Sequence, residues 1–163
     1  MDKSVYIPYD MLKLADSTNS LIIPNGYFNG DDITTFNISN NGVFNNREPF
    51  IPSFYMHSLK RIVIGDECFG KVRVFELNGL DELESVMIWK DSFRIDIYER
   101  SDSSCRMVNC PKLKSIQIGD RSFNDYHSFE LNNLPSLQSI DIGDSCFFYA
   151  PSFSLTGLID ELV

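Results

Sequence analysis

One recurring pattern restricts the folds open to this chain more than any other feature. Leu59, Leu83, Leu113 and Leu137 are 24, 30 and 24 residues apart, and each opens a segment with the same apolar positions. Counted from the leucine, apolar residues recur at offsets 0, 3, 5, 10, 16, 18 and 21. A period of this length is typical of architectures built by stacking equivalent units. We call each segment a unit and give positions by this offset.

The second unit keeps the pattern across an insertion. Its apolar positions follow the other units up to Phe93, and the pattern resumes at Cys105 once six extra residues within "RIDIYERSDSS" are passed over. The end of this insertion is polar, and added length in a surface loop costs little free energy. We therefore expect a surface loop here, with the same alignment of units before and after it.

The spacing within a unit predicts two short strands. Offsets 3 and 5 alternate with polar positions, as do offsets 16 and 18, and a period of two is the mark of a β-strand. The "GD" at offsets 6 and 7 of three units predicts a turn after the first strand. The proline in "NLPSL" and "NCPKL" disfavours continuation of the second strand. Stacked units would align these strands about 4.8 Å apart around a core of Leu, Ile and Phe.

Length and composition agree with a single β-rich domain. The 163 residues include 13 Phe and 7 Tyr, and aromatic side chains suit a pleated sheet. Upstream of Leu59 the pattern is weaker: Ile23 matches offset 5, and Phe36 and Ile38 match offsets 16 and 18 two residues late. The expected organisation of residues 1–163 is an N-terminal cap over 1–20, a degenerate unit and a loop over 21–58, four repeats over 59–158, and over 159–163 either a C-terminal cap or the irregular end of a longer array.

The frame L-x-x-I-x-I-x-x-x-x-F resembles that of leucine-rich repeats. The step "IGDxxF", followed by a second strand and "NLPxL", is similar to the treponemal, BspA-like class, over residues 59–158 and more weakly over 21–58. The resemblance implies a leucine-rich-repeat solenoid, β-rich with a parallel sheet on each face and little helix, which convention places in the α/β horseshoe class. The common class keeps asparagine at offset 8, whereas this chain does not. We therefore expect another group, such as the Asp at offset 7, to satisfy the turn.

The outward side chains of the first strand predict a binding surface. In such solenoids this sheet lines the concave face, where partners usually bind. Trp89 stands at offset 6, where the other three units have glycine, and Met87 faces the same way. Tryptophan and methionine are enriched at the centres of protein interfaces; the alternative is that Trp89 tucks under the insertion of its own unit. The predicted partner-binding residues are Trp89, Met87, Lys90, Arg61, Val63, Gln117 and Asp141.

Charge and hydropathy narrow the class of partner. The formal net charge is −9, which repels nucleic acid and anionic membranes and favours a protein partner with a basic surface. No apolar run reaches the 18 or so residues that cross a bilayer, so we expect no membrane insertion. The first residues, "MDKSVYIPYDMLK", lack the apolar core of a secretory signal, which favours the cytoplasm; a cell-surface or extracellular location is the alternative. The sequence does not determine the oligomeric state.

Three groups of residues could carry chemistry, and each has a structural interpretation. Asp66, Asp120 and Asp144 could form a calcium column, but Lys90 interrupts it and turn capping explains all three. The four cysteines form no CxxC motif and fit a buried, reduced state, although a disulfide between Cys105 and Cys110 is possible in an oxidising compartment. Neither His57 nor His127 has a partner at a known catalytic spacing. We therefore expect no metal, no cofactor and no enzymatic activity.

Two functions follow as hypotheses. The first is a non-catalytic module that binds a protein partner on the concave sheet around Trp89. The alternative is a structural role, as a scaffold or a surface-adhesin segment of a longer repeat array.

Overall fold

The computed structural model describes residues 20–26, 35–39 and 59–158, so the expected N-terminal cap (apart from Ser20) and the residues after 158 lie outside the described part of the chain. The strands are β1 (Ser20–Ile23), β2 (Thr35–Ser39), β3 (Arg61–Ile64), β4 (Val74–Asn78), β5 (Ser85–Ile88), β6 (Ser104–Val108), β7 (Ser115–Ile118), β8 (Ser128–Asn132), β9 (Ser139–Ile142) and β10 (Ser152–Thr156). A 3₁₀ helix, η1 (Ile97–Asp102), lies in the insertion and is the sole helix within the described ranges.

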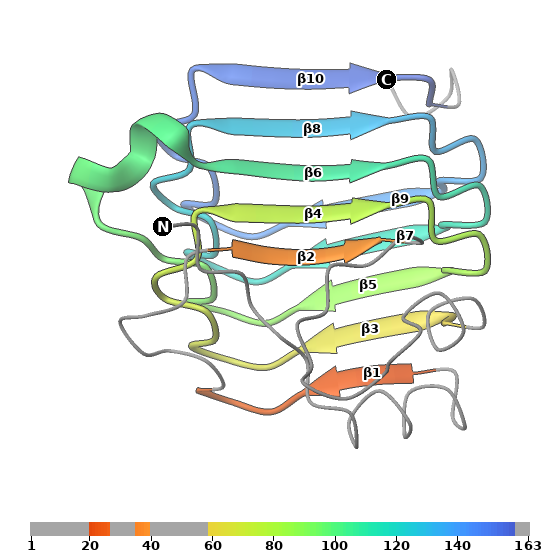
Figure 1. Ribbon diagram of the computed structural model, residues 1–163, viewed down its shortest axis with the longest axis horizontal. Coiled ribbons are helices and arrows are strands. Elements are labelled where there is room, and N and C mark those ends of the chain that lie inside the picture. Colours follow the sequence, from red (N-terminus) through yellow and green to blue (C-terminus); the bar gives the residue numbers. More distant parts are fainter. Residues whose placement is uncertain (1–19, 27–34, 40–58, 159–163) are drawn as a thin grey trace, which may run out of the picture.

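The strands form two parallel sheets between which the chain alternates. The odd-strand sheet has the order β1-β3-β5-β7-β9, and the even-strand sheet has the order β10-β8-β6-β4-β2. In Figure 1 the two sheets lie one behind the other with their strands running in opposite directions, and η1 projects from one edge of the stack. The prediction of parallel β-sheets with very little helix is confirmed, and the arrangement is compatible with a β-solenoid.

Strand register pairs residues of equal offset. Ile62 pairs with Val86 in the odd-strand sheet, and the insertion does not disturb the even-strand sheet, in which Phe75 pairs with Cys105. Upstream, Phe36 pairs with Phe75, so the late alignment of this weaker segment is confirmed. Because a one-residue slip would turn the apolar residues of a strand to solvent, burial of these positions fixes the register.

A stack of phenylalanines forms the centre of the core. Phe69, Phe93, Phe123 and Phe147 occupy offset 10 of successive units, and their neighbouring ring centroids lie 5.0, 4.6 and 5.2 Å apart in stacked geometry. All four have positive φ, between 50° and 57°, a left-handed conformation that is unfavourable for a bulky residue. Their near-complete burial and ring stacking offset this strain.

Hydrogen bonds between units satisfy the turns. The N–H at offset 8 donates to the carbonyl oxygen at offset 7 of the following unit, as from Glu67 to Lys90 at 3.1 Å and from Asp91 to Asp120 at 2.9 Å. The offset 8 residues also have positive φ, which aims the N–H along the stack. The turns are thus joined by backbone bonds without an asparagine side chain at offset 8. Asparagine side chains instead connect the second turn, where Asn133 Nδ2 donates to Asn109 Oδ1 at 3.0 Å.

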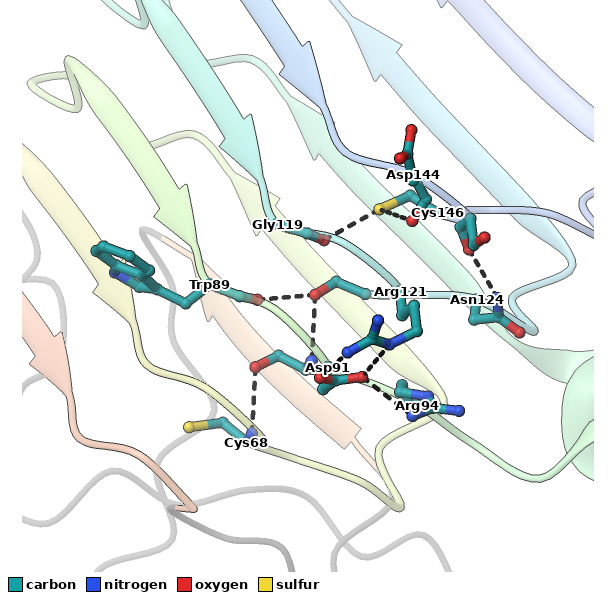
Figure 2. Close-up of polar contacts among 12 residues, drawn as sticks. Cys68, Trp89, Asp91, Arg94, Gly119, Arg121, Asn124, Asp144 and Cys146 are labelled. Carbon is teal, nitrogen blue, oxygen red and sulfur yellow. Dashed lines mark hydrogen bonds and ion pairs between the residues drawn. The ribbon is translucent and has the colours of Figure 1, made fainter.

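A second row of bonds runs through offset 9, which is Cys68, Ser92, Ser122 and Cys146 in the four units. Ser122 Oγ donates to the Trp89 carbonyl at 2.8 Å and accepts the N–H of Ser92 at 3.1 Å. Cys146 Sγ donates to the Gly119 carbonyl at 3.1 Å (Figure 2). The interpretation of Cys68 and Cys146 as small apolar fillers is therefore incomplete, because each thiol also bonds to the preceding unit.

Tyr126 joins two units across the insertion. It lies at offset 13 of the third unit, and its hydroxyl donates to the carbonyl of Val72, at offset 13 of the first unit. In the second unit, which lies between these two, the insertion interrupts the pattern at this point, so Tyr126 bonds to the first unit instead. Tyr126 is fully buried and packs edge-on against Phe123. One buried side chain thus closes the gap that the insertion leaves in the stack.

Replacing Gly119 by alanine should destabilise the fold. An added Cβ would lie 2.5 Å from the Lys90 nitrogen and 2.7 Å from the Trp89 carbonyl carbon, both backbone atoms that cannot rotate away. We expect a loss of about 1–3 kcal/mol in the free energy of unfolding, as for overpacked sites, measured by urea denaturation. Ser139→Ala on the exposed side of β9 is the control and should change stability by less than about 0.5 kcal/mol. Equal stability of the two variants would contradict the close-approach explanation.

Candidate protein-binding face

The predicted binding residues lie on the odd-strand sheet or in the turn that follows β5. We call the outward surface formed by offsets 2, 4 and 6 of β1, β3, β5, β7 and β9 the odd-strand face. Both sheets have five strands, with the same spacing of about 4.8 Å between strands. The described residues therefore place equal numbers of strands on the two sides, and the concave shape of this face stays a prediction.

One row across the odd-strand face changes from apolar to acidic. Strand register places Ile22, Val63, Met87, Gln117 and Asp141 side by side at offset 4. Ile22 is 55% exposed, so the apolar part of the row extends to β1. Ile22 was not among the predicted binding residues, because these come from the four clearer units over 59–158 and not from the weakly matching segment 21–38. The row thus has an aliphatic half over β1, β3 and β5 and a polar half over β7 and β9.

Trp89 is the largest apolar side chain exposed on this face. It is 52% exposed and lines a shallow pocket of about 120 Å³ with Met87, Ile88, Gln117 and Gly119. None of the described residues of the insertion lines this pocket, and the 52% exposure of Trp89 argues against the alternative in which it tucks under the insertion. The glycine at offset 6 of the third unit matters here, because it leaves space beside the indole on the neighbouring strand.

The remaining predicted residues are spread more widely. Arg61 begins β3 and is exposed, four residues and therefore about 13 Å along the strand direction from the Trp89 position. Asp141 lies on β9 in the same row as Met87, two strands and therefore about 10 Å away from it. Lys90 is exposed in the turn directly after Trp89. The structure therefore groups Trp89, Met87 and Gln117 in one pocket and places the charged residues around it.

A charged cluster that the sequence analysis did not select lies at the turn edge. Asp91 accepts two bonds of 2.8 Å from Arg121 Nε and Nη2 and one of 3.0 Å from Arg94 Nη1. Figure 2 shows this cluster pointing away from the Trp89 indole. The hydrogen bond from Arg121 is the main cause that lowers the pKa of Asp91, and the charges of Arg121 and Arg94 add to it. These residues line an open groove of about 630 Å³ together with Glu67, Gly70, Lys71, Ile95 and Asp96.

The outward surface of the even-strand sheet is polar. Arg106 donates to Glu76 Oε2 at 2.9 Å and to Glu130 Oε2 at 2.7 Å, which joins β4, β6 and β8. The hydrogen bond to Glu130 is the leading cause that raises the pKa of Arg106. These paired charges sit at offset 17 and leave this sheet with no apolar patch comparable to the Trp89 pocket over β4, β6 and β8. The odd-strand face is therefore the stronger candidate for a protein interface.

Within the aspartate series, Asp120 caps the turn of the following unit. Asp120 Oδ1 accepts the Asp144 N–H at 2.9 Å, and Asn25 Oδ1 accepts the Asp66 N–H at 2.8 Å at the equivalent turn. Where Lys90 replaces the aspartate, Asp66 Oδ1 is buried with no hydrogen-bond partner in the structure. Within residues 20–26, 35–39 and 59–158, no three His, Cys, Asp or Glu side chains come together as a metal site. The same part of the chain contains no helix long and apolar enough to cross a membrane.

All four cysteines are free thiols. Burial raises the pKa of Cys110 to about 11 and raises that of Cys105 well above its usual range, while Cys146 is shifted in the same direction. Cys105 and Cys110 therefore act as buried apolar residues, and the alternative of a disulfide between them is not present in the structure.

Comparisons of this chain with known protein families, characterised proteins and solved structures find no match. Its function must therefore be argued from the residues and the geometry described above.

Asp91→Asn should lower thermal stability in a pH-dependent way. Because the pKa of Asp91 is lowered in the folded state, its carboxylate stabilises the fold above the unfolded pKa of about 3.9 and loses this effect as the pH falls through the folded value. At pH 7 we expect Tm to fall by about 2–4 °C, with the difference from wild type disappearing in acid. Asp141→Asn, an exposed carboxylate outside the cluster, is the control. A difference from wild type that persists after the Asp91 carboxyl has been protonated in acid would argue against ion pairing as the cause.

The thiols should react slowly in the native protein. A raised pKa leaves little thiolate at pH 8, and burial limits access to Cys68, Cys105 and Cys110. Titration with a chromogenic disulfide reagent should detect four thiols after the protein is unfolded without reductant. The thiols should react with the reagent at least tenfold faster in the unfolded than in the folded protein. Fewer than four thiols in the unfolded protein would instead indicate a disulfide.

Proposed function

We propose that the chain is a leucine-rich-repeat solenoid of the BspA-like kind and acts as a non-catalytic protein-binding module. The fold part of this proposal is supported by the sequence offsets and by a register that pairs equal offsets across eight strand pairs. Stacked units of this kind offer a broad, regular surface for recognition.

The exposed Trp89 beside an apolar row is the observation that carries the binding proposal. A tryptophan with 52% of its surface in water gains free energy when a partner covers it, and Trp is among the residues that dominate interface energetics. The pocket that it shares with Met87 and Gln117 suits one apolar side chain of a partner. The aliphatic residues Val63 and Ile22 extend the contact along the row.

The charge around this pocket favours a basic partner. Asp141 ends the offset 4 row, and the whole chain carries a formal charge of −9. A partner with an apolar anchor and a Lys or Arg about 10 Å from it would place the anchor beside Met87 and the cation beside Asp141. Long-range attraction would raise the association rate at low salt.

Trp89→Ala should reduce partner affinity by at least tenfold, which corresponds to about 1.4 kcal/mol. The partner is first captured from a lysate of the source cells with the wild-type chain, and its affinity for each variant is then measured by titration calorimetry. Met87→Ala should weaken binding in the same direction.

Tyr98→Ala is the matched control, because Tyr98 is an aromatic residue on the insertion with 92% of its surface exposed. It should leave the affinity unchanged. Binding that survives Trp89→Ala but is lost with Tyr98→Ala would move the interface to the insertion and refute the odd-strand face as the binding surface.

A further inference from the structure

The end of the stack at β9 and β10 exposes residues that are core residues in every inner unit. Phe153 is 55% exposed and Leu155 is 37% exposed, whereas their neighbours on β8, Phe129 and Leu131, are 1% and 0% exposed. In Figure 1 β10 is the outermost of the described strands of its sheet. The aromatic side chains of Phe148 and Tyr149 are also exposed between β9 and β10.

The opposite end of the stack differs. Leu21 and Ile23 on β1 and Ile38 on β2 are at most 1% exposed although these strands also end their sheets. A second copy stacked head to tail would therefore place its β1 and β2 end, where the apolar residues are already buried, against the exposed β10 end of the first copy. Of the two ends formed by the described strands, the β10 end alone offers apolar rows to a partner, so a symmetric contact between two such ends fits the structure better.

The edge strand β10 carries no charge. The inner strands of the same sheet have Glu76, Arg106 and Glu130 at offset 17, where β10 has Ser154. Proteins usually protect an exposed edge strand from pairing by placing charged residues or proline on it. The sequence of β10, Ser-Phe-Ser-Leu-Thr, has neither, and its small hydroxyl side chains would not obstruct a second strand.

We propose that β10 is a self-association edge through which two copies of this chain pair tail to tail. Antiparallel pairing of β10 with its symmetry mate, centred on Ser154, places Phe153 opposite Leu155 of the other copy. This arrangement keeps both apolar residues on the inner face and both outer serines on the polar face. It extends the even-strand sheet across a two-fold axis and closes after two copies. The contact uses neither Trp89 nor its pocket, so it is independent of the proposed binding function.

Sedimentation velocity of the full chain tests this proposal. We use concentrations up to about 200 µM in about 0.3 M NaCl, where repulsion between two acidic chains is screened. We expect a reversible dimer of twice the 18.7 kDa chain mass. Phe153→Lys places a charge on the inner face of the edge and should weaken dimerisation at least tenfold.

Trp89→Lys is the matched control, since Trp89 and Phe153 have nearly equal exposure, 52% and 55%, and it should leave the dimer intact. If Phe153→Lys fails to fold by circular dichroism, amide hydrogen exchange of the wild type decides instead: protection of residues 152–156 should rise with protein concentration. A monomer at the highest concentration would overturn the proposal and point to another occupant, such as a further repeat unit. A dimer that resists Phe153→Lys, or assembly beyond two copies, would also overturn it.

Discussion

The left-handed residues that begin each turn determine how the whole structure is held together. At offset 8 a positive φ directs the backbone N–H along the stack, where only the next unit supplies a carbonyl oxygen. At offset 10 the same conformation aims a phenylalanine into the ring stack. Both groups are satisfied by a neighbour and not within their own unit. Removal of a neighbouring unit would therefore leave both groups without their partners.

Much of the fold could be predicted because its rule is periodic. Alternating apolar offsets predicted the strand positions, and the resumption of the pattern at Cys105 predicted that the insertion would leave the sheets intact, as the pairing of Phe75 with Cys105 confirms. The offset 9 bonds were not predicted, since Ser and Cys look unrelated until both are seen to donate to the same carbonyl position. The Tyr126 contact was also missed, because it joins units that are 54 residues apart.

The candidate site was predictable only where one strand determined it. Trp89 was identified because its neighbours in the pattern are glycines, and alternation along β5 placed Met87 on the same face. Ile22 was missed because its alignment depends on a weakly matching segment. The Asp91 cluster was missed although Asp91 and Arg121 share offset 8 of neighbouring units, because outward residues were sought on the first strand and not in the turn that follows it. The exposure of Phe153 and Leu155 was likewise missed, because it depends on whether another strand covers β10, and the spacing of apolar residues within β10 does not indicate this.

The bond from Tyr126 to Val72 has a consequence for how such a chain can change over evolutionary time. Since one side chain connects the first and third units directly, this contact between them does not depend on the length of the inserted loop. Its exposed residues are then free to vary independently of the sheets, whereas Ile95 and Ser103 near its two ends are buried. The insertion, with Tyr98 exposed on it, is in this sense an exchangeable segment on a fixed support, and a new recognition loop could be grafted there without redesigning the stack.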